Sequence, residues 1–506
     1  MKFPVLQFAM ITSIIFLSAC NTLVKSENVM TPTQVEDIVS SPEPSPSPEA
    51  ADPTSTATIP APTIAPTSVP VSDNPQYVIT VKVDYNWHKL SVAQSVTIPN
   101  PSTEPIEELI LVVQSNWYPS AFHLIELTWG DGSPIENYDL EGIELRIALD
   151  NPISPGETRN IAMVYDLVLP PISTSEEYGP IPFGFTNRQT NLVDWYPYVP
   201  PYQEGEGWLV HKPWFYGEHL VYPVADFDIA LEVMNAPASL SIAASALDTG
   251  DENIHRYQLK NGRNFVFSLS PSYKVFEGQV GDTIVLGYAF TYDHRAGQAA
   301  FDTTIEALTL FEEIFHPYEQ PVMTLIEADF LHGMEYQNLY FLSRGFYNTF
   351  DDAKGSFLVS IAAHETAHQW WYGLVGNDQA LEPWLDEALC TYSELLFYEH
   401  LYPEALDTWW WPQRVAYYEP TGWVDLHLYN SGGYRPYRDA VYFQGAYFLD
   451  ELRSSMGDEA FFSFLQTYIV TFKGKIATTD DFFNLLTTYT SAEFDNLRAK
   501  YFQGTP

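Results

Sequence analysis

His364, Glu365 and His368 form an H-E-x-x-H pattern, and Glu387 follows after residues 369–386. On a helix, positions i and i+4 share one face, so the two histidines can offer imidazole nitrogens to a single metal ion. Glu365 then points slightly around the helix, off the metal but within reach of a water bound to it. Glu387 can supply the third ligand of a tetrahedral zinc site whose fourth position stays open. The pattern therefore predicts a catalytic zinc centre with Glu365 as its general base.

Two helices have to position these side chains. Residues 356–372 contain neither Gly nor Pro and end at Gly373, which predicts one helix that carries both histidines. A second helix should begin near Pro383 and continue to the residues before Pro403. Because the connection between them is short, the second helix can fold back and bring Glu387 to the metal.

The same residues resemble those of a known family. HETAH, the spacing to Glu387 and the segment Trp384-Leu385-Asp386-Glu387-Ala388 look like the zinc aminopeptidases of the alanyl aminopeptidase (aminopeptidase N) family, a group of gluzincin metallopeptidases. The family usually shows W-L-N-E-G here, so Asp386 and Ala388 are departures from its pattern. The resemblance implies one bound zinc ion and an α+β multidomain fold. In that fold an N-terminal antiparallel β-saddle domain is followed by a mainly helical, thermolysin-like catalytic domain.

Gly333-Met334-Glu335-Tyr336 is similar to the family motif G-A-M-E-N, whose glutamate holds the free α-ammonium group of the substrate. Tyr336 stands in place of the asparagine, and His332-Gly333 in place of Gly-Ala. The resemblance implies Gly333, Met334 and Glu335 as substrate-binding residues. Independently of any family, a carboxylate that faces the open side of the metal is what selection for a cationic N-terminus requires.

Residues 441–446 are similar to the family segment V-Y-E-K-G-A, whose tyrosine hydroxyl stabilises the tetrahedral intermediate. The resemblance implies Tyr442 as the oxyanion donor, and the flanking Gly445 and Ala446 single it out among the many tyrosines of the chain.

These residues together predict the hydrolysis of N-terminal residues from peptides. Glu365 would activate the zinc-bound water and later return a proton to the leaving amine, Tyr442 would stabilise the oxyanion, and Glu335 would hold the α-ammonium group. Two alternatives remain open from the sequence. A zinc endopeptidase would use the same metal chemistry without Glu335 facing the cleft. A non-catalytic, peptidase-like surface binding protein would keep the fold without turnover.

The first residues predict export and lipid attachment. Lys2 precedes a mostly apolar stretch from Phe8 to Phe16, and Leu17-Ser18-Ala19-Cys20 follows. This arrangement resembles a bacterial lipoprotein signal, so residues 1–19 are the expected signal peptide and Cys20 is the expected lipid-bearing residue. An ordinary signal peptide or an uncleaved anchor is the alternative, and each of them would also export the protein. We expect an extracytoplasmic, membrane-anchored bacterial lipoprotein on the cell envelope.

Composition divides the rest of the chain into three parts. Residues 20–76 are rich in Pro, Ser, Thr and Ala and lack aromatic residues, which predicts a disordered tether. Residues 77–290 alternate apolar and polar side chains between turn residues, which predicts an antiparallel β domain. Near Phe290 the apolar spacing becomes helical, and residues 291–506 contain every catalytic candidate. This last part is the expected zinc peptidase domain.

Charge and cysteine content exclude several other functions. The chain has 65 acidic and 23 basic residues, which argues against nucleic acid as a partner. This acidity either attracts cationic peptides or keeps an exported protein soluble. Cys390 is the one cysteine besides Cys20, so no intramolecular disulfide framework is expected. Cys390 itself is predicted to be a small buried residue and not a catalytic thiol.

Overall fold

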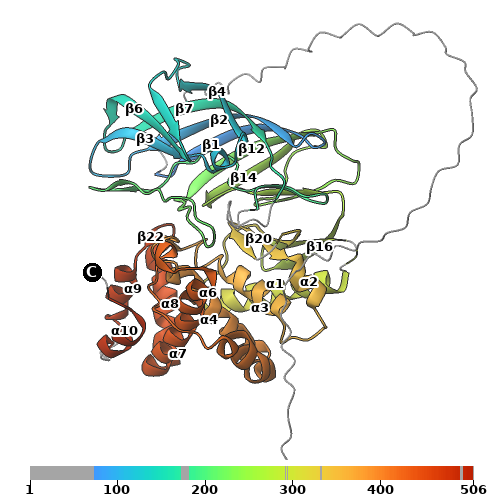
Figure 1. Ribbon diagram of the computed structural model, residues 1–506, viewed down its shortest axis with the longest axis vertical. Coiled ribbons are helices and arrows are strands. Elements are labelled where there is room, and N and C mark those ends of the chain that lie inside the picture. The colour runs from blue at the N-terminus through green and yellow to red at the C-terminus, as the bar shows by residue number, and fades with distance from the viewer. Residues whose placement is uncertain are drawn as a thin grey trace, which may run out of the picture. The chain divides into compact units, whose positions relative to one another are not determined.

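The computed structural model describes residues 73–172, 182–290, 292, 294–330, 333–489 and 494–504. The predicted signal peptide, the lipidation site Cys20 and almost all of the predicted tether lie outside these residues. The described residues belong to one structural unit, residues 58–506. In this unit strands come first and helices follow (Figure 1). None of the described helices combines the length and the apolar composition that a membrane span needs.

The first half of this unit is built around a six-stranded sheet with the order β14-β12-β1-β2-β7-β4. Tyr77, Ile79, Val81 and Val83 alternate with more exposed residues along β1, so one face of the strand is buried, as the period-two pattern predicts. Neighbouring strands are antiparallel except for β1 and β12, which are parallel. The strands are β1 (Gln76–Asp84), β2 (Lys89–Pro99), β4 (Phe122–Trp129), β7 (Thr158–Val168), β12 (Ala225–Met234) and β14 (His255–Gly262).

Smaller elements complete the strand-rich half and share its apolar core, which contains Trp195 and Phe267. They are β3 (Ile106–Val112), β5 (Tyr138–Glu141), β6 (Glu144–Ile153), β8 (Gly184–Phe185), β9 (Thr190–Leu192), β10 (Tyr202–Gln203), β11 (Gly207–Trp208), β13 (Ser241–Ala244), β15 (Phe267–Ser270) and the 3₁₀ turn η1 (Gln114–Trp117). Residues 209–224, between β11 and β12, form neither helix nor strand. We call them the 209–224 loop, because they carry a side chain into the site described below.

A five-stranded sheet with the order β16-β17-β18-β20-β19 joins the two halves. Its strands are β16 (Tyr273–Val280), β17 (Thr283–Phe290), β18 (Val322–Ala328), β19 (Met334–Tyr336) and β20 (Leu339–Ser343). Phe276 and Val285 pack into the core of the helices, whereas Tyr288 and Phe290 pack into the core of the strands. The change from strands to helices falls close to residue 291, but this sheet extends across that position. The division of the chain into domains stays a prediction.

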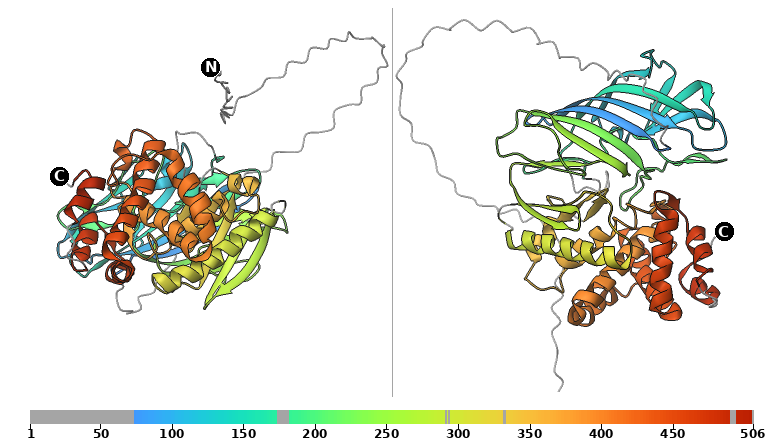
Figure 2. Two further views of the ribbon diagram at one scale, coloured as in Figure 1. Left: turned by 90° about the horizontal axis from the view of Figure 1, so that it is seen from below. Right: turned by 180° about the vertical axis from the view of Figure 1, so that it is seen from behind.

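Helices form most of the second half, and α1 and α3 pack together against the five-stranded sheet (Figure 2). The α-helices are α1 (His294–Ile314), α2 (Arg344–Thr349), α3 (Phe357–Ala367), α4 (Trp384–Leu401), α5 (Pro403–Ala405), α6 (Tyr434–Arg438), α7 (Gly445–Met456), α8 (Asp458–Phe472), α9 (Thr479–Leu486) and α10 (Asp495–Tyr501). Between them lie the π-helical η2 (Leu406–Val415) and η5 (Asp439–Gln444), the 3₁₀ turns η3 (Ala416–Tyr418) and η4 (Leu428–Asn430), and the short pair β21 (Gly376–Asn377) and β22 (Ile476–Ala477).

The helix that carries both histidines is shorter than predicted. The sequence predicts a helix that continues to Tyr372, but α3 ends at Ala367 and His368 is its C-cap. Residues 368–370 form a turn, and beyond it the buried Arg263 donates to the carbonyls of Tyr372 and Gly373. The φ of Tyr372 is 138°, which is incompatible with a continuing helix. The second predicted helix is confirmed, since α4 begins directly after Pro383.

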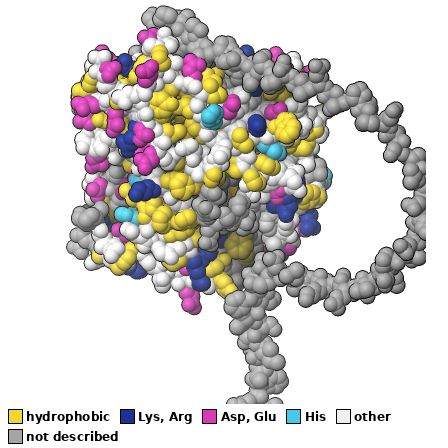
Figure 3. Space-filling view, turned by 45° about the horizontal axis from the view of Figure 1, so that its top comes forward, with side chains coloured by type: hydrophobic (Ala, Val, Ile, Leu, Met, Phe, Trp, Pro, Cys, Tyr) yellow, Lys and Arg dark blue, Asp and Glu magenta, His cyan; other side chains and the backbone are white. Residues whose placement is uncertain are grey.

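The described surface is acidic without one dominant acidic patch on the face drawn in Figure 3, where Asp and Glu side chains are spread among apolar and neutral ones. Several of the exposed carboxylates pair with nearby bases, as Asp352 does with Arg295 at 2.8 Å. This distribution favours a solvated surface over a docking face for a cationic partner on this side of the molecule.

Candidate active site

Helices α3 and α4 bring the three predicted metal ligands together. Nε2 of His364 lies 3.1 Å from Oε2 of Glu387, and Nε2 of His368 lies 3.8 Å from the same oxygen. The ligand atoms of all three residues lie within 4.8 Å of one another. A zinc ion with bonds of about 2.0–2.1 Å has tetrahedral ligand atoms about 3.3 Å apart, so this spacing fits it.

Each histidine is supported by a carboxylate on α4. Nδ1 of His364 donates to Oε1 of Glu394 at 2.9 Å, and Nδ1 of His368 donates to Oδ1 of Asp386 at 2.5 Å. Because Nδ1 carries the proton, Nε2 keeps its lone pair for a metal. Asp386, where the family pattern has Asn, thus gives the second histidine a charged support like that of the first.

Glu394 is held in turn by a buried cation. Arg414 donates from Nε and Nη2 to the two oxygens of Glu394, at 3.0 and 2.7 Å, and Trp410 donates from Nε1 at 3.0 Å. Burial favours the neutral form of Glu394, but Arg414 and His364 outweigh it and lower the pKa to about 2. This supporting role of Glu394 was not predicted. The feature of the sequence that indicates this role is helical spacing, since Glu394 lies two turns beyond Glu387 on the same helix.

The ligand cluster is acidic enough to require a cation. Burial disfavours a charged imidazole, but the carboxylates of Glu387 and Glu394 outweigh it and raise the pKa of His364 to about 9. Two lone pairs at the distance between Nε2 of His364 and Oε2 of Glu387 repel each other unless a positive centre lies between them. A proton can satisfy this one pair, whereas a divalent ion reaches all three ligands. The donor set therefore fits zinc.

Glu365, the predicted base, lies beside these ligands and is 5% exposed. Its Oε2 has no hydrogen-bond partner among the described residues. A buried oxygen without a partner destabilises the fold unless a ligand supplies the missing hydrogen bond. Burial raises the pKa of Glu365 to about 7. Gly333 makes room for this side chain, because a Cβ at position 333 would lie 2.0 Å from Oε1 of Glu365. The structure thus places Gly333 against the base, while Met334 and Glu335 line a pocket.

Tyr442, the predicted oxyanion donor, projects from η5 into the same cluster. Its hydroxyl donates to Oε1 of Glu387, and its ring stacks on His364 with centroids 5.9 Å apart. Burial and the charge of Glu387 raise the pKa of Tyr442 well above its usual range, so the hydroxyl keeps its proton and can donate it in a hydrogen bond. Cys390 is buried below Asp386, and burial raises the pKa of its thiol, as expected for a structural cysteine.

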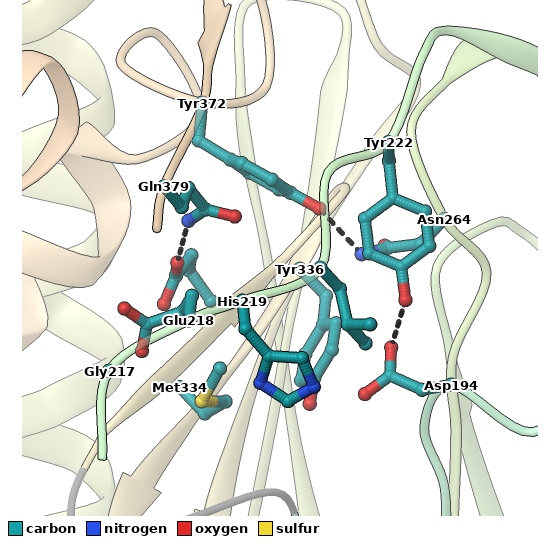
Figure 4. Close-up of a pocket in the computed structure, with 12 residues that line it drawn as sticks. Asp194, Gly217, Glu218, His219, Tyr222, Asn264, Met334, Tyr336, Tyr372 and Gln379 are labelled. Carbon is teal, nitrogen blue, oxygen red and sulfur yellow. Dashed lines mark hydrogen bonds between the residues drawn. The ribbon is translucent and has the colours of Figure 1, made fainter. Parts of the chain in front are cut away.

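The pocket next to the ligands is lined by Met334 and Glu335 from β19 together with Glu218, Asp194 and Gln379 (Figure 4). Its free volume is about 30 Å³. Burial raises the pKa of Glu335 to about 8, and the neighbouring carboxylate Asp386 adds to this effect. A cation in the pocket would favour the ionised form of Glu335. The pocket thus offers an anionic binding site one side chain away from the metal ligands.

Gln379 connects this pocket to the ligand cluster. Its Nε2 donates to Oε1 of Glu335 at 2.9 Å and to Oδ2 of Asp386 at 2.7 Å, so each amide hydrogen has its own carboxylate. The side chain is buried, and it comes from the connection that precedes α4. Gln379, Glu218 and Asp194 were not predicted, because each reaches the pocket from a segment without a motif.

Comparison with known proteins assigns the second half of the chain. Residues 299–501 match the Peptidase family M1 domain. Aminopeptidase M1-D of Oryza sativa subsp. japonica is 26% identical over 216 residues, which cover 40% of this chain and 25% of that protein. Aminopeptidase O of Homo sapiens is 26% identical over 201 residues, covering 34% and 24%. Aminopeptidase M1 of Arabidopsis thaliana is 29% identical over 204 residues, covering 37% and 23%. The chain thus spans about a quarter of the length of the curated relatives it matches.

Solved structures resemble nearly the whole described chain. The M1 zinc metallopeptidase from Deinococcus radiodurans has a TM-score of 0.61 at 20% identity, over 86% of this chain and 94% of that one. A mutant of that protein with a Tyr-Ser-Ala substrate bound has a TM-score of 0.59 at 19% identity, over 86% and 95%. This likeness confirms the predicted α+β fold, with a strand-rich first half and a helical second half. The domain match relates residues 299–501 to peptidase family M1, and the solved structures show the same fold for the described chain.

Proposed function

We propose that this chain is a zinc-dependent aminopeptidase that removes N-terminal residues from peptides. The observation that carries the proposal is the position of Glu335, which is a buried carboxylate. Gln379 links Glu335 by hydrogen bonds to Asp386, and Asp386 in turn supports the predicted ligand His368. An anchor for the α-ammonium group at a fixed place beside the metal selects the first peptide bond for hydrolysis. The names of the matched relatives, which are aminopeptidases, support the same activity.

In this proposal His364, His368 and Glu387 hold the metal. Zinc bound there stabilises negative charge on the scissile carbonyl and lowers the pKa of a water. Glu365 takes the proton of the attacking water and returns it to the leaving amine. The Tyr442 hydroxyl donates a hydrogen bond to the oxyanion. Glu335 accepts hydrogen bonds from the substrate α-ammonium and so orients the first residue.

Hydrolysis of one short peptide, supplied with a free or an acetylated N-terminus, tests this proposal. We expect the zinc-loaded chain to cleave only the free form and to release its first residue. Glu335→Ala should lose activity mainly on free amino termini. Internal cleavage of both peptides would identify an endopeptidase. No cleavage of any peptide by the zinc-loaded chain would favour a peptidase-like binding protein.

We also propose that the protein is exported and lipid-anchored through Cys20, supported by the apolar stretch and the small residues that precede this cysteine. Metabolic labelling with a fatty acid in a bacterial host should mark the wild-type chain and leave Cys20→Ser unlabelled. Equal labelling of both, or of neither, would contradict attachment at this residue.

A further inference from the structure

Arg263 is a buried cation whose partners are all backbone carbonyls. It lies in the connection between β14 and β15, and it is 2% exposed. Its guanidinium group makes no ion pair with a carboxylate of the described residues. Burial lowers the pKa of Arg263 to about 10, so the group still carries its charge at neutral pH. A guanidinium group offers five N–H donors in a fixed plane, so the segments that it binds are held in a fixed relation to one another.

The guanidinium group of Arg263 joins the 209–224 loop to the helical half. Its Nη1 donates to the carbonyl of Tyr222 near the end of this loop, at 2.8 Å. Nε and Nη2 donate to the carbonyls of residues 372–374, and Nη2 also donates to that of Lys475 at 3.0 Å. One side chain therefore binds three segments that are far apart in the sequence.

Asn264, the next residue, extends these contacts to β19. Its Oδ1 accepts a hydrogen bond from the backbone N–H of Gln337 at 3.0 Å, and the N–H of Arg263 donates to Oε1 of Gln337 at 3.3 Å. Gln337 directly follows β19, which carries Glu335. Nδ2 of Asn264 donates to the hydroxyl of Tyr372 at 2.6 Å, as Figure 4 shows. Two consecutive residues thus contact β19 as well as the segments that Arg263 binds.

The segments bound by Arg263 and Asn264 are the ones that bring Glu218, Glu335 and Gln379 to the pocket. Tyr222 lies four residues after Glu218, and Gln337 lies two residues after Glu335. Residues 372–374 begin the connection that carries Gln379. Neither Arg263 nor Asn264 makes a hydrogen bond with the predicted metal ligands. Their contacts therefore concern the pocket and not the metal.

Charge repulsion gives these segments a reason to need such support. Burial raises the pKa of Glu218 well above its usual range, and the carboxylate of Glu335 raises it further. Two carboxylates that are close enough for this effect repel each other when both are ionised. Hydrogen bonds behind the pocket oppose this repulsion without occupying the space that a substrate needs.

Gly376 leaves room for the guanidinium group of Arg263. A Cβ at position 376 would lie 2.6 Å from both Cζ and Nη1 of Arg263. Gly376 belongs to the short strand β21, and its φ is not in the left-handed region, so alanine can adopt this backbone. Gly376→Ala would therefore displace the guanidinium group without removing any hydrogen-bonding atom.

We propose that Arg263 and Asn264 are positioning residues that hold Glu218, Glu335 and Gln379 in the geometry that binds an α-ammonium group. The inference rests on the proposed aminopeptidase function and adds the residues that shape its amine pocket. The pocket has a free volume of about 30 Å³, so a small shift of one segment changes which groups can reach an ammonium. Misplacement by about 1 Å is enough to weaken a bound geometry severely.

Arg263→Lys tests the proposal by kinetics, because lysine keeps the charge but has no planar fork to reach all of these carbonyls. We expect KM for a short peptide with a free N-terminus to rise at least about tenfold. The values of kcat and of zinc affinity should stay within about threefold of wild type, because this variant alters binding and not the metal chemistry. Arg295→Lys makes the same change in an exposed pair with Asp352 and should alter none of these quantities.

Gly376→Ala is the second variant, and it tests the proposal even if Arg263→Lys does not fold. It should raise KM in the same way and leave zinc affinity unchanged.

Hydrogen exchange gives a readout that needs no substrate. In both variants, amide exchange should become faster together in residues 218–224, 334–338 and 372–379, while α3 and α4 exchange as in the wild type.

The remaining outcomes overturn the inference. Wild-type KM values in both variants would show that the pocket does not depend on Arg263. Parallel losses of kcat, zinc affinity and substrate binding would show that Arg263 stabilises the whole fold and has no selective role at the pocket. If the wild-type chain cleaved no peptide with a free N-terminus, the proposed function would fail. The exchange rates would then still support or exclude a shared support of the three segments.

Discussion

The metal side and the substrate side of this site are built in different ways. The metal side comes from two consecutive helices, with His364 to His368 at the end of α3 and Glu387 to Glu394 on α4. The substrate side comes from three separated segments, which contribute Glu218, Glu335 and Gln379. Short-range helical spacing therefore sets the metal chemistry, whereas the selection of substrate depends on tertiary structure. Variants on each side should have separable effects.

The largest expected effect belongs to the metal side. Glu365→Gln removes the base but none of the three ligands, so turnover should fall about 10²- to 10⁴-fold while zinc stays bound. Steady-state kinetics and metal analysis of the same preparation measure the two quantities. Near-wild-type turnover would show that another group takes the proton, and loss of zinc would show that the base and the ligands are not separable.

Asp386→Asn tests whether the charged support of His368 serves the metal side. Asparagine can still accept from Nδ1 but carries no charge, so zinc affinity should fall about 10- to 100-fold. Competition with a chelator measures this change. Glu335→Gln is the matched control on the substrate side and should raise KM for free amino termini without changing zinc affinity. If Asp386→Asn changed KM alone, Asp386 would belong to the substrate side.

Gln379→Leu should affect both the metal side and the substrate side, because Gln379 donates to Glu335 and to Asp386. Removing it leaves two buried carboxylates without these donors. We expect KM for free amino termini to rise and zinc affinity to fall, each by about tenfold. Gln298→Leu, which removes an exposed bond to Asp302 on α1, should change neither quantity. A change in KM alone would show that Gln379 supports only the substrate side, and a change in zinc affinity alone would show that it supports only the metal side.

The sequence predicted the metal side of the site more directly than the substrate side. His364 and His368 share one face of a helix with Glu365 beside them, and a short connection returns a second helix that carries Glu387, so local patterns were enough to group these four residues. The strands of the first half and the start of α4 were also predicted from local patterns. Glu335 and Tyr442 needed the resemblance to a family, because a single carboxylate or tyrosine carries no spacing signal.

The parts that the sequence did not predict depend on contacts between distant residues. Arg263 donates to the carbonyls of Tyr372 and Gly373 in the segment after the histidine helix, and no local pattern reports this contact between distant residues. Glu218 reaches the pocket through a loop without regular structure. The five-stranded sheet crosses the expected boundary because β17 pairs in parallel with β18 on the far side of α1. A change of period shows where helices begin but not which strands will pair.

The smallest expected effect concerns the stability of the substrate side. His219 follows Glu218 in the 209–224 loop, and its Nε2 lies 3.2 Å from Oε1 of Gln114 in the strand-rich half. Burial lowers its pKa to about 3 in the folded chain, against about 6.5 when unfolded. As pH falls below about 6.5 the unfolded chain binds a proton that the folded chain excludes, so stability is lost as pH falls.

Between pH 7 and pH 6 this group should lower the free energy of unfolding by about 0.7 kcal/mol. In His219→Gln the side chain is neutral at both pH values, so the variant should lose less stability than the wild type by that amount. Urea titrations of both proteins at the two pH values measure the difference. Parallel losses would mean that His219 is protonated to the same extent in the folded and unfolded chains. The contact between the 209–224 loop and the strand-rich half would then not depend on a neutral imidazole, and the substrate side would be less sensitive to acid than its burial predicts.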